Sequence, residues 1–342
     1  MSNLKYFKSS FWVTGLGLLL GAGVGYYYNP TVSAAFQGLF ICFVLGLLEV
    51  SISFDNAVVN ATVLKDMTPQ WQHRFITWGM LIAVFGMRLV FPLLIVSLVA
   101  HVSPWAAIEL AAFQPDEYAK IMLSVHNEVA AFGGAFLMLV ALKYFFDEAK
   151  EIHWIRIVEA PLAKMGRLEA VEVGLVIIFI YIMSLQLPHA DQLSFVIAGL
   201  AGIITFIGVE AVGTFLEVPE SGKADIHRAS IGMFLYLEVL DASFSFDGVI
   251  GAFAITNNLF IIAIGLGIGA MFVRSLTIMM VEKGTLEAFR YLEHGAFYAV
   301  GALAVIMFMN TVMHIPEAVT GVIGAAFIGL SIYSSHLAKG KA

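Results

Sequence analysis

The stretch EVSISFD at residues 49–55 and the stretch DASFSFD at residues 241–247 carry one pattern without a gap. Each places two carboxylates six residues apart, with two serines between them, inside an otherwise apolar segment. A charged residue within a membrane-spanning segment costs roughly 2.5–3.5 kcal/mol on insertion scales, so such acids usually serve a function. A doubled acidic motif in apolar surroundings therefore predicts a pathway for cations.

The composition indicates an integral membrane protein. Of the 342 residues, 60% are hydrophobic and 13% are charged, and the mean hydropathy is +0.89. A soluble domain carries about 25% charged residues, roughly twice this share. Cys42 is the only cysteine, which excludes a disulfide framework and a thiolate metal cluster. The net charge of −7 says little about soluble partners, because a membrane protein's charges are separated between its two sides.

Apolar runs of about 17–25 residues predict ten membrane-spanning helices. Arg88 and Arg274 lie inside predicted spans, and among the remaining Lys and Arg residues only Lys120 falls on the side opposite the N-terminus. Because basic residues favour cytoplasmic loops, this bias predicts that both termini are cytoplasmic. The predicted spans cover residues 11–28, 36–64, 75–100, 126–146, 172–187, 193–216, 229–256, 258–281, 296–313 and 318–336.

Three segments outside the acidic motifs have their own predictions. Residues 1–28 resemble a signal peptide, but the apolar run is long and no clean small-x-small site follows, so we expect it to be kept as the first span. Residues 147–171 mix acids and bases around an apolar pair, and we predict an amphipathic helix at the membrane interface. Residues 101–125 are expected to form a re-entrant or surface cap. No segment resembles a nucleic-acid-binding patch.

The two acidic motifs predict an inverted repeat. They fall in the second and seventh predicted spans, which cross the membrane in opposite directions. Inverted repeats with a site near the bilayer midplane are common in secondary transporters. We therefore expect an all-α, polytopic chain forming one membrane domain over 1–342. Its parts are a leading helix at 1–35, repeat one at 36–146, a cytoplasmic segment with two linking helices at 147–228, repeat two at 229–313, and a final helix with a tail at 314–342.

Helix geometry constrains how the acids of one motif meet. Residues six apart are rotated by about 240° on a regular α-helix, so Glu49 and Asp55 would not share a face. Both reach one ion only if the helix unwinds, and Asn56 and Gly248 tolerate the necessary backbone angles. The predicted metal ligands are Glu49, Asp55, Asp241 and Asp247, assisted by Ser53, Asn56 and Ser245, with Glu238 as a ligand or proton acceptor.

The chemistry of this set favours a hard cation. Carboxylate, hydroxyl and amide oxygens without histidine or cysteine suit Mn²⁺, Mg²⁺ or Ca²⁺ and argue against Zn²⁺ or Cu⁺. Four or five acids exceed the charge of one divalent ion. Because clustered carboxylates favour each other's protonated form, the surplus offers a means of exchanging protons for metal.

Several residues allow two interpretations. Arg88 and Arg274 are either counter-charges released when the ion binds or permanent structural partners. Asp55 and Asp247 are, in the structural alternative, simply paired with these arginines. Glu210 is either a proton relay or an interhelical hydrogen-bonding group. Glu293 and His294, near the inner end of the ninth span, are expected to be solvated.

At these motifs the chain resembles the TerC-like family of bacterial membrane proteins, which is named for tellurium resistance, and more closely an uncharacterised branch of it. The resemblance rests on FDNAVV at residues 54–59, Glu238 with Asp241, Phe246-Asp247, AFAIT at 252–256, GGAFL at 133–137 and YLEHG at 291–295. It covers most of residues 36–313, although Gly248 stands where family members typically have serine. Several members look like Mn²⁺ exporters. The resemblance thus implies manganese efflux across the bacterial cytoplasmic (inner) membrane.

Three hypotheses for function follow. The first is a transporter, with Mn²⁺ as the favoured substrate, that works by alternating access and needs no resident cofactor. The second is a membrane scaffold that recruits cytoplasmic stress-resistance proteins through residues 147–171. The third is an exporter of a small organic cation. An enzyme is not expected, because neither a serine–histidine pair nor a His-Glu-x-x-His zinc motif appears. Glycine-rich spans would allow a homodimer.

Overall fold

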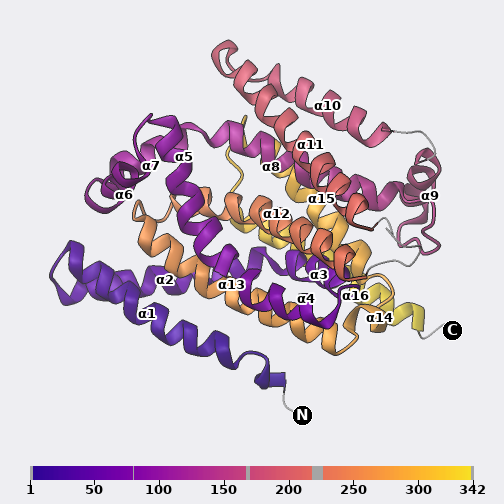
Figure 1. Cartoon of the computed structure of the whole chain (residues 1–342), viewed down its shortest axis with the longest axis horizontal. Coiled ribbons are helices and arrows are strands. Elements are labelled where there is room, and N and C mark those ends of the chain that lie inside the picture. The colour runs from indigo at the N-terminus through magenta and orange to yellow at the C-terminus, as the bar shows by residue number, and fades with distance from the viewer. Residues whose placement is uncertain (1–2, 80, 167–169, 218–225, 340–342) are drawn as a thin grey trace.

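The computed structural model describes residues 3–79, 81–166, 170–217 and 226–339, and helices are the only regular structure within them. The all-α prediction is confirmed (Figure 1). The first half contains η1 (Asn3–Lys5), α1 (Lys8–Tyr28), α2 (Val32–Ile52), α3 (Phe54–Leu64), α4 (Pro69–Arg74), η2 (Phe75–Gly79), η3 (Ile82–Val90), α5 (Phe91–Val99), α6 (Pro104–Phe113), α7 (Pro115–Ser124) and α8 (His126–Phe146). The second half contains α9 (Arg156–Met165), α10 (Val171–Ser184), α11 (His189–Glu217), α12 (Ile226–Ala252), α13 (Leu259–Glu282), α14 (Thr285–Ala288), α15 (Leu292–Asn310) and α16 (Glu317–Lys339).

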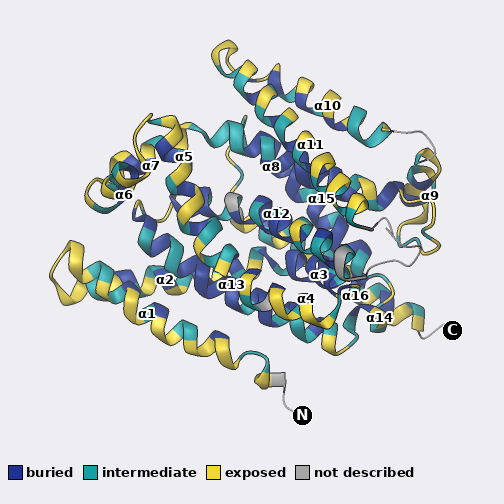
Figure 2. Ribbon diagram, in the orientation of Figure 1, coloured by how far each residue is buried: buried dark blue, intermediate teal, exposed yellow. Residues whose placement is uncertain are grey.

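Helices α3, α8, α13 and α15 form the buried centre, whereas α1 and α10 expose many of their apolar side chains, as lipid-facing helices do (Figure 2). α8 packs against α11 and α15, and α2 packs against α1 and α13. The small residues Gly38, Cys42 and Gly46 lie on the buried face of α2. Small side chains let helix backbones approach closely, which is how helices associate in a membrane.

Nine helices within the described residues are long and apolar enough to span a membrane. The remaining predicted span, at 172–187, forms α10, which has 14 residues. Such a helix is about 21 Å long, shorter than the roughly 30 Å hydrocarbon core. It lies beside α11 and runs in the opposite direction (Figure 1).

The second predicted span is interrupted, but the seventh is not. α2 ends at Ile52 and α3 begins at Phe54, so the break falls at Ser53, between the two acids of the first motif. α12, by contrast, continues through Asp247 to Ala252. The prediction of unwinding at Gly248 is therefore wrong. Glycine is tolerated in a helix that is stabilised by tertiary packing.

The third span contains two π-helical stretches, η2 and η3, within the apolar segment Pro69–Val99. π-helical turns are rare and occur frequently at functional sites. Arg88 lies in η3.

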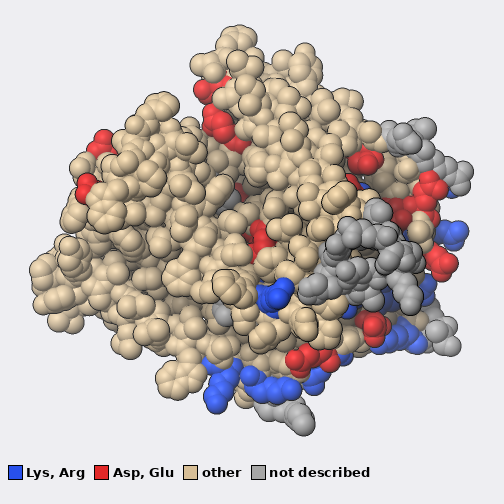
Figure 3. Space-filling view, in the orientation of Figure 1, with Lys and Arg blue, Asp and Glu red and all other residues tan. Residues whose placement is uncertain are grey.

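Basic residues gather at one end of the molecule. In the face shown in Figure 3, Lys and Arg lie along the lower edge, and both ends of the chain lie in the lower right half of the view in Figure 1. At the other end, residues 101–125 form α6 and α7, which pack on each other and on α5.

Candidate functional site

The first acid of the first motif is paired with an arginine. Glu49 and Arg88 are 5% and 4% exposed, and Arg88 Nη2 donates to Glu49 Oε1. The hydroxyl of Ser53 donates to the same oxygen over 3.2 Å. Arg88 Nη1 donates to the carbonyl of Ala83 over 2.6 Å. Such pairing is expected, because an isolated buried charge is very costly.

The first acid of the second motif has the same kind of partner. Arg274 Nη2 lies 3.2 Å from Asp241 Oδ2, and both residues are buried. The other carboxylate oxygen, Oδ1, accepts a 2.7 Å hydrogen bond from the amide of Asn60 on α3. Arg274 also donates to the carbonyls of Phe75 and Gly79, both in η2, over 2.6 Å each.

The two halves of the chain therefore repeat one contact. In each half, the first acid of the motif pairs with the arginine of the following span: Glu49 with Arg88, and Asp241 with Arg274. The structural alternative, in which the arginines pair with Asp55 and Asp247, is therefore wrong.

A small buried cavity lies between the two pairs. It offers about 20 Å³ to the centres of water-sized molecules, and roughly 10–15 Å³ by this measure is enough for one water. Three side-chain oxygens in its wall have no hydrogen-bond partner among the described residues: Asn56 Oδ1, Asn60 Oδ1 and Ser245 Oγ. Its lining residues are Glu49, Asn56, Asn60, Ala83, Arg88, Asp241, Phe244, Ser245, Ala270, Val273 and Arg274.

Three of the predicted acids lie outside the cavity wall. Asp55 and Asp247 are buried and partly buried, respectively. In the part of the chain that the structure describes, Asp55 Oδ1 and both carboxylate oxygens of Glu238 have no hydrogen-bond partner. Glu238 Oε1 lies 4.0 Å from Arg274 Nη2. Glu238 Oε1 is also so close to Gly79 that a Cβ there would overlap it. Among the described residues, no three His, Cys, Asp or Glu side chains are arranged to hold one metal ion. The structure thus does not bring the four predicted carboxylate ligands around one point.

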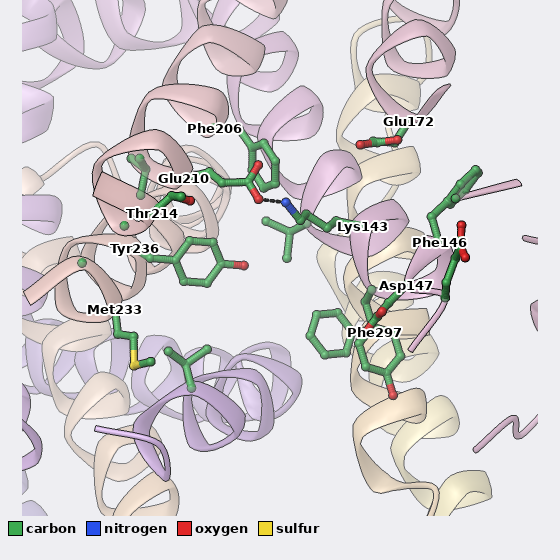
Figure 4. Close-up of a pocket in the computed structure, with 18 residues that line it drawn as sticks. Lys143, Phe146, Asp147, Glu172, Phe206, Glu210, Thr214, Met233, Tyr236 and Phe297 are labelled. Carbon is green, nitrogen blue, oxygen red and sulfur yellow. Dashed lines mark ion pairs between the residues drawn. The ribbon is translucent and has the colours of Figure 1, made fainter. Parts of the chain in front are cut away.

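Glu210 belongs to a second, larger cavity. It forms an ion pair with Lys143 between α11 and α8, and both residues line a space of about 740 Å³ (Figure 4). Glu210 does not line the small cavity between the arginines.

Two functional candidates were missed by the sequence analysis. One is Asn60, although Asn56 and Asn60 are one helical turn apart and this spacing places them on one face. The other is Glu159 in α9, which is fully buried. Its carboxylate accepts bonds from the backbone N–H groups of Trp154 and Ile155 over 3.2 and 3.1 Å.

Glu159 is the centre of a charged cluster that holds the 147–165 segment against the spans. Its Oε2 lies 3.3 Å from Lys150 Nζ, 3.6 Å from His153 Nδ1 and 3.3 Å from His294 Nε2. Burial acts to raise the pKa of Glu159, but the N–H groups of Ile155 and Trp154, with His294 and Lys150, outweigh burial and lower it. His294 is 3% exposed, so the prediction that it is solvated is wrong. The predicted amphipathic helix is shorter than 147–171, and its residues 167–169 lie outside the described residues.

Comparison with known proteins agrees with a multi-pass membrane protein. The chain is 24% identical over 342 residues to the uncharacterized membrane protein STKORF319 of Myxococcus xanthus, covering 96% of this chain and 82% of that protein. No solved structure matches the chain significantly. Residues 54–341 match the family described as "Protein of unknown function (DUF475)", and because this match spans most of the chain, the protein belongs to the DUF475 family.

Proposed function

We propose that this protein transports a hard divalent cation, with Mn²⁺ as the favoured substrate and efflux as the direction. The observation that carries the proposal is the buried cavity between two acid–arginine pairs, with three unpartnered neutral oxygens in its wall. A buried polar atom without a partner costs about 1–3 kcal/mol. A cation coordinated there would satisfy all three oxygens at once.

The donor set of the cavity fits a hard ion. Glu49 and Asp241 supply carboxylates, Asn56 and Asn60 supply amide oxygens, and Ser245 supplies a hydroxyl. Oxygen donors of these kinds suit Mn²⁺, Mg²⁺ and Ca²⁺. None of the described lining residues is a histidine or a cysteine, the donors that softer metals prefer. The implied Mn²⁺ preference rests on the motif resemblance alone.

The arginines supply a counter-charge that the cation can replace. The two carboxylates and two guanidinium groups balance each other in charge. When a divalent cation takes the carboxylates, each guanidinium retains backbone acceptors, Ala83 for Arg88, and Phe75 and Gly79 for Arg274. Both arginines would then be released from their acids rather than kept as permanent structural partners.

Coupling to protons belongs to the same proposal. Asp55, Asp247 and Glu238 lie outside the cavity wall and form the surplus of acids that could carry protons in exchange. Uptake of ⁵⁴Mn²⁺ by inverted vesicles that is insensitive to a pH gradient would remove this part without removing the transporter.

The test compares variants of the two cavity acids under manganese stress. Cells with the native protein should hold less Mn²⁺ and survive higher external Mn²⁺ than cells without it. Glu49→Gln and Asp241→Asn should lose that protection, because each leaves an arginine without its anion and removes a ligand charge. Asp116→Asn is the matched control, since Asp116 also accepts a side-chain hydrogen bond, from Asn257, but is exposed and lines neither cavity.

Proteoliposomes containing the purified variants separate transport from folding. Flux of ⁵⁴Mn²⁺ should be lost in the two cavity variants that remain monodisperse in detergent. Equal protection and equal flux in all of them would contradict the proposal.

A scaffold receives less support, because Glu159 and its partners hold the 147–165 segment against the spans. Deleting residues 149–165, none of which lines either cavity, would discriminate the two, since a scaffold loses its role whereas a transporter keeps cation flux.

A further inference from the structure

The larger cavity of about 740 Å³ opens between the ends of α8, α11 and α12 on the side of α9. Figure 4 shows Lys143 and Glu210 meeting as an ion pair, with the Tyr236 ring directed toward the same space. One water's share of liquid volume is about 30 Å³, so the cavity has room for an ion with its hydration shell. We call it the vestibule, defined by Lys143, Glu172, Glu210, Met233 and Tyr236 with their neighbours.

The vestibule is negatively charged. Four carboxylates line it, against one cationic side chain, that of Lys143, among the described lining residues; the four are Asp147, Glu148, Glu172 and Glu210. Hollows lined by one sign of charge concentrate counter-ions, by focusing the field between low-dielectric walls. The charge alone does not make a site, but it selects cations over anions.

The vestibule and the small cavity are stacked along the same two helices. On α3, Val63 lines the vestibule and Asn60, three residues earlier, lines the small cavity. On α12, Tyr236 lines the vestibule and Asp241, five residues later, lines the small cavity. At 1.5 Å per residue these steps are about 4.5 and 7.5 Å along the helix axes.

The layer between them is thin and mostly apolar. On α12, Leu237 and Leu240 lie between Tyr236 and Asp241 and have no exposed surface, and on α3 Ala61, which follows Asn60 toward Val63, has none either. The same stretch of α12 also contains Glu238, whose Oε1 lies 4.0 Å from Arg274 Nη2. Such a layer keeps water from the buried charges, yet it spans only about one helical turn. A modest movement of α12 against α3 would join the two spaces.

We propose that the vestibule is the entrance by which a hydrated divalent cation reaches the small cavity from the side of the protein that carries both termini. This inference rests on the proposed function of the small cavity and adds the side and the path of entry. Cations would collect among the vestibule carboxylates, lose water past Tyr236 and pass the Leu237–Leu240 layer to meet Glu49 and Asp241.

Cysteine accessibility tests the path in a nearly native protein. Cys42 is the only cysteine and is fully buried, and Cys42→Ser keeps a donor for the carbonyl of Ile261. In that background, Thr214→Cys and Met233→Cys place a thiol in the vestibule. Ile204→Cys is the matched control, because Ile204 lies on the same helix as Thr214, is 69% exposed and does not line the vestibule.

The probe is a membrane-impermeant cationic methanethiosulfonate reagent, added to one face of sealed vesicles. Lys5→Cys marks the face of the N-terminus and Asn29→Cys marks the opposite face. Both vestibule thiols should react only from the Lys5 face, and ⁵⁴Mn²⁺ flux should then be lost. The same treatment with the reagent should leave ⁵⁴Mn²⁺ flux through Ile204→Cys unchanged. Flux that persists after full labelling of Met233→Cys, or labelling only from the Asn29 face, would overturn the inference.

A second measurement separates the two proposals. Glu172→Gln should raise the Mn²⁺ concentration for half-maximal flux at low salt while leaving the maximal rate unchanged, and the difference should shrink at high salt. Glu109→Gln, an exposed change in α6, should do neither. If unmodified variants move no Mn²⁺, the proposed function itself fails. Only the entrance proposal is wrong if the cysteine variants move Mn²⁺, labelling leaves their flux unchanged, and Glu172→Gln leaves the Mn²⁺ concentration for half-maximal flux unchanged.

Discussion

The buried acids and arginines that line the small cavity are paired with each other, so replacing one of them also disturbs folding. Arg274 contacts Asp241 and two backbone carbonyls, and Asp241 uses its second oxygen for Asn60. Removing one member of such a buried pair commonly costs 3–5 kcal/mol, because the other charge is left uncompensated. Changes to Glu49 or Asp241 therefore lower the stability of the fold as well as the affinity for the cation. A neutral residue such as Asn60 allows the two to be separated.

Replacing Asn60 with alanine should weaken cation binding strongly. The change removes an amide oxygen that faces the cavity and a 2.7 Å hydrogen bond that orients Asp241. Hydrogen bonds to charged groups contribute about 1.5–3 kcal/mol, which corresponds to roughly 10- to 100-fold in Kd. Calorimetry with Mn²⁺ on the purified protein measures the effect.

Asn257→Ala is the control for Asn60→Ala. Asn257 donates the same kind of bond, 2.7 Å long, to the carboxylate of Asp116, but both residues are exposed and neither lines the small cavity. Its Kd should match that of the native protein. A native-like Kd for a folded Asn60→Ala variant would show that Asn60 is not a ligand.

The sequence predicted which residues carry the buried charge, but not how they are paired. Glu49, Asp241, Arg88 and Arg274 stand out because charge is rare in apolar runs. Their pairing depends on the packing of spans far apart along the chain, which one sequence does not show. The contact between Glu159 and His294 was missed for the same reason, because 135 residues separate them.

Helices α2 and α13 meet at glycines that fix the position of Glu49. A Cβ at Gly269 on α13 would overlap Glu49 Cβ and Cγ and the carbonyl of Gly46. Gly269→Ala should therefore destabilise the protein and displace the Glu49 carboxylate. Overpacking costs about 1–3 kcal/mol, which outweighs the roughly 0.5–1 kcal/mol gained when alanine replaces a helical glycine. Thermal unfolding in detergent should show a lower Tm, and ⁵⁴Mn²⁺ flux should fall.

Gly208→Ala on α11 is the matched change, because nothing lies within 4 Å of the added Cβ. Here only the gain in helix propensity remains, so the Tm should be equal or slightly higher. If Gly269→Ala behaved like Gly208→Ala, the close contact of α2 with α13 would not be limiting.

Glu159 should make the attachment of α9 depend on pH. Its pKa is lowered in the folded protein, so its contribution is present above the ordinary pKa of about 4.3 and is lost as the pH falls below that value toward the folded one. Hydrogen–deuterium exchange of residues 154–165 should therefore increase in acid in the native protein. Glu159→Gln should show fast exchange already at pH 7 and little further change.

Glu151→Gln is the control within the same segment, because Glu151 is exposed. It should reproduce the native exchange profile. Exchange in Glu159→Gln that stays slow at pH 7 would mean that packing around Trp154, and not the carboxylate, holds the segment.

Hydrophobic periodicity located the helices but not their irregularities. The break at Ser53 was expected near Asp55 because two acids six residues apart need it, whereas the same argument failed for α12. The π-helical stretches η2 and η3 have no signal in apolar sequence. Their carbonyls are nonetheless the acceptors for both buried arginines.

The whole molecule combines two similar acid–arginine units with further helices that differ between the two halves of the chain. Glu49 with Arg88 and Asp241 with Arg274 meet at one cavity, as an inverted repeat would bring them. The helices between the units, α9 to α11, lie to one side (Figure 1), and α11 forms much of the vestibule wall, with Glu172 of α10. The short helix α10 decides whether the proposed orientation holds.

An even number of crossings is required for both termini to lie on one side. Nine described helices are long enough to span, so α10 must cross as well for the C-terminus to return to the N-terminal side. The bilayer can thin locally around a short helix at a cost of fractions of a kcal/mol per Å. We therefore predict that a fluorescent protein fused after Lys339 is fluorescent in bacterial cells, and that alkaline phosphatase fused there is inactive.

Phosphatase fused after Gln114, between α6 and α7, should be active, because that segment lies at the opposite end from Lys339. Fusion after Pro188, between α10 and α11, reports on α10 directly. Activity there means that α10 crosses. Inactive phosphatase after Pro188 together with active phosphatase after Lys339 would mean that α10 stays on the N-terminal side, and the C-terminal half of the chain would then have the reverse orientation.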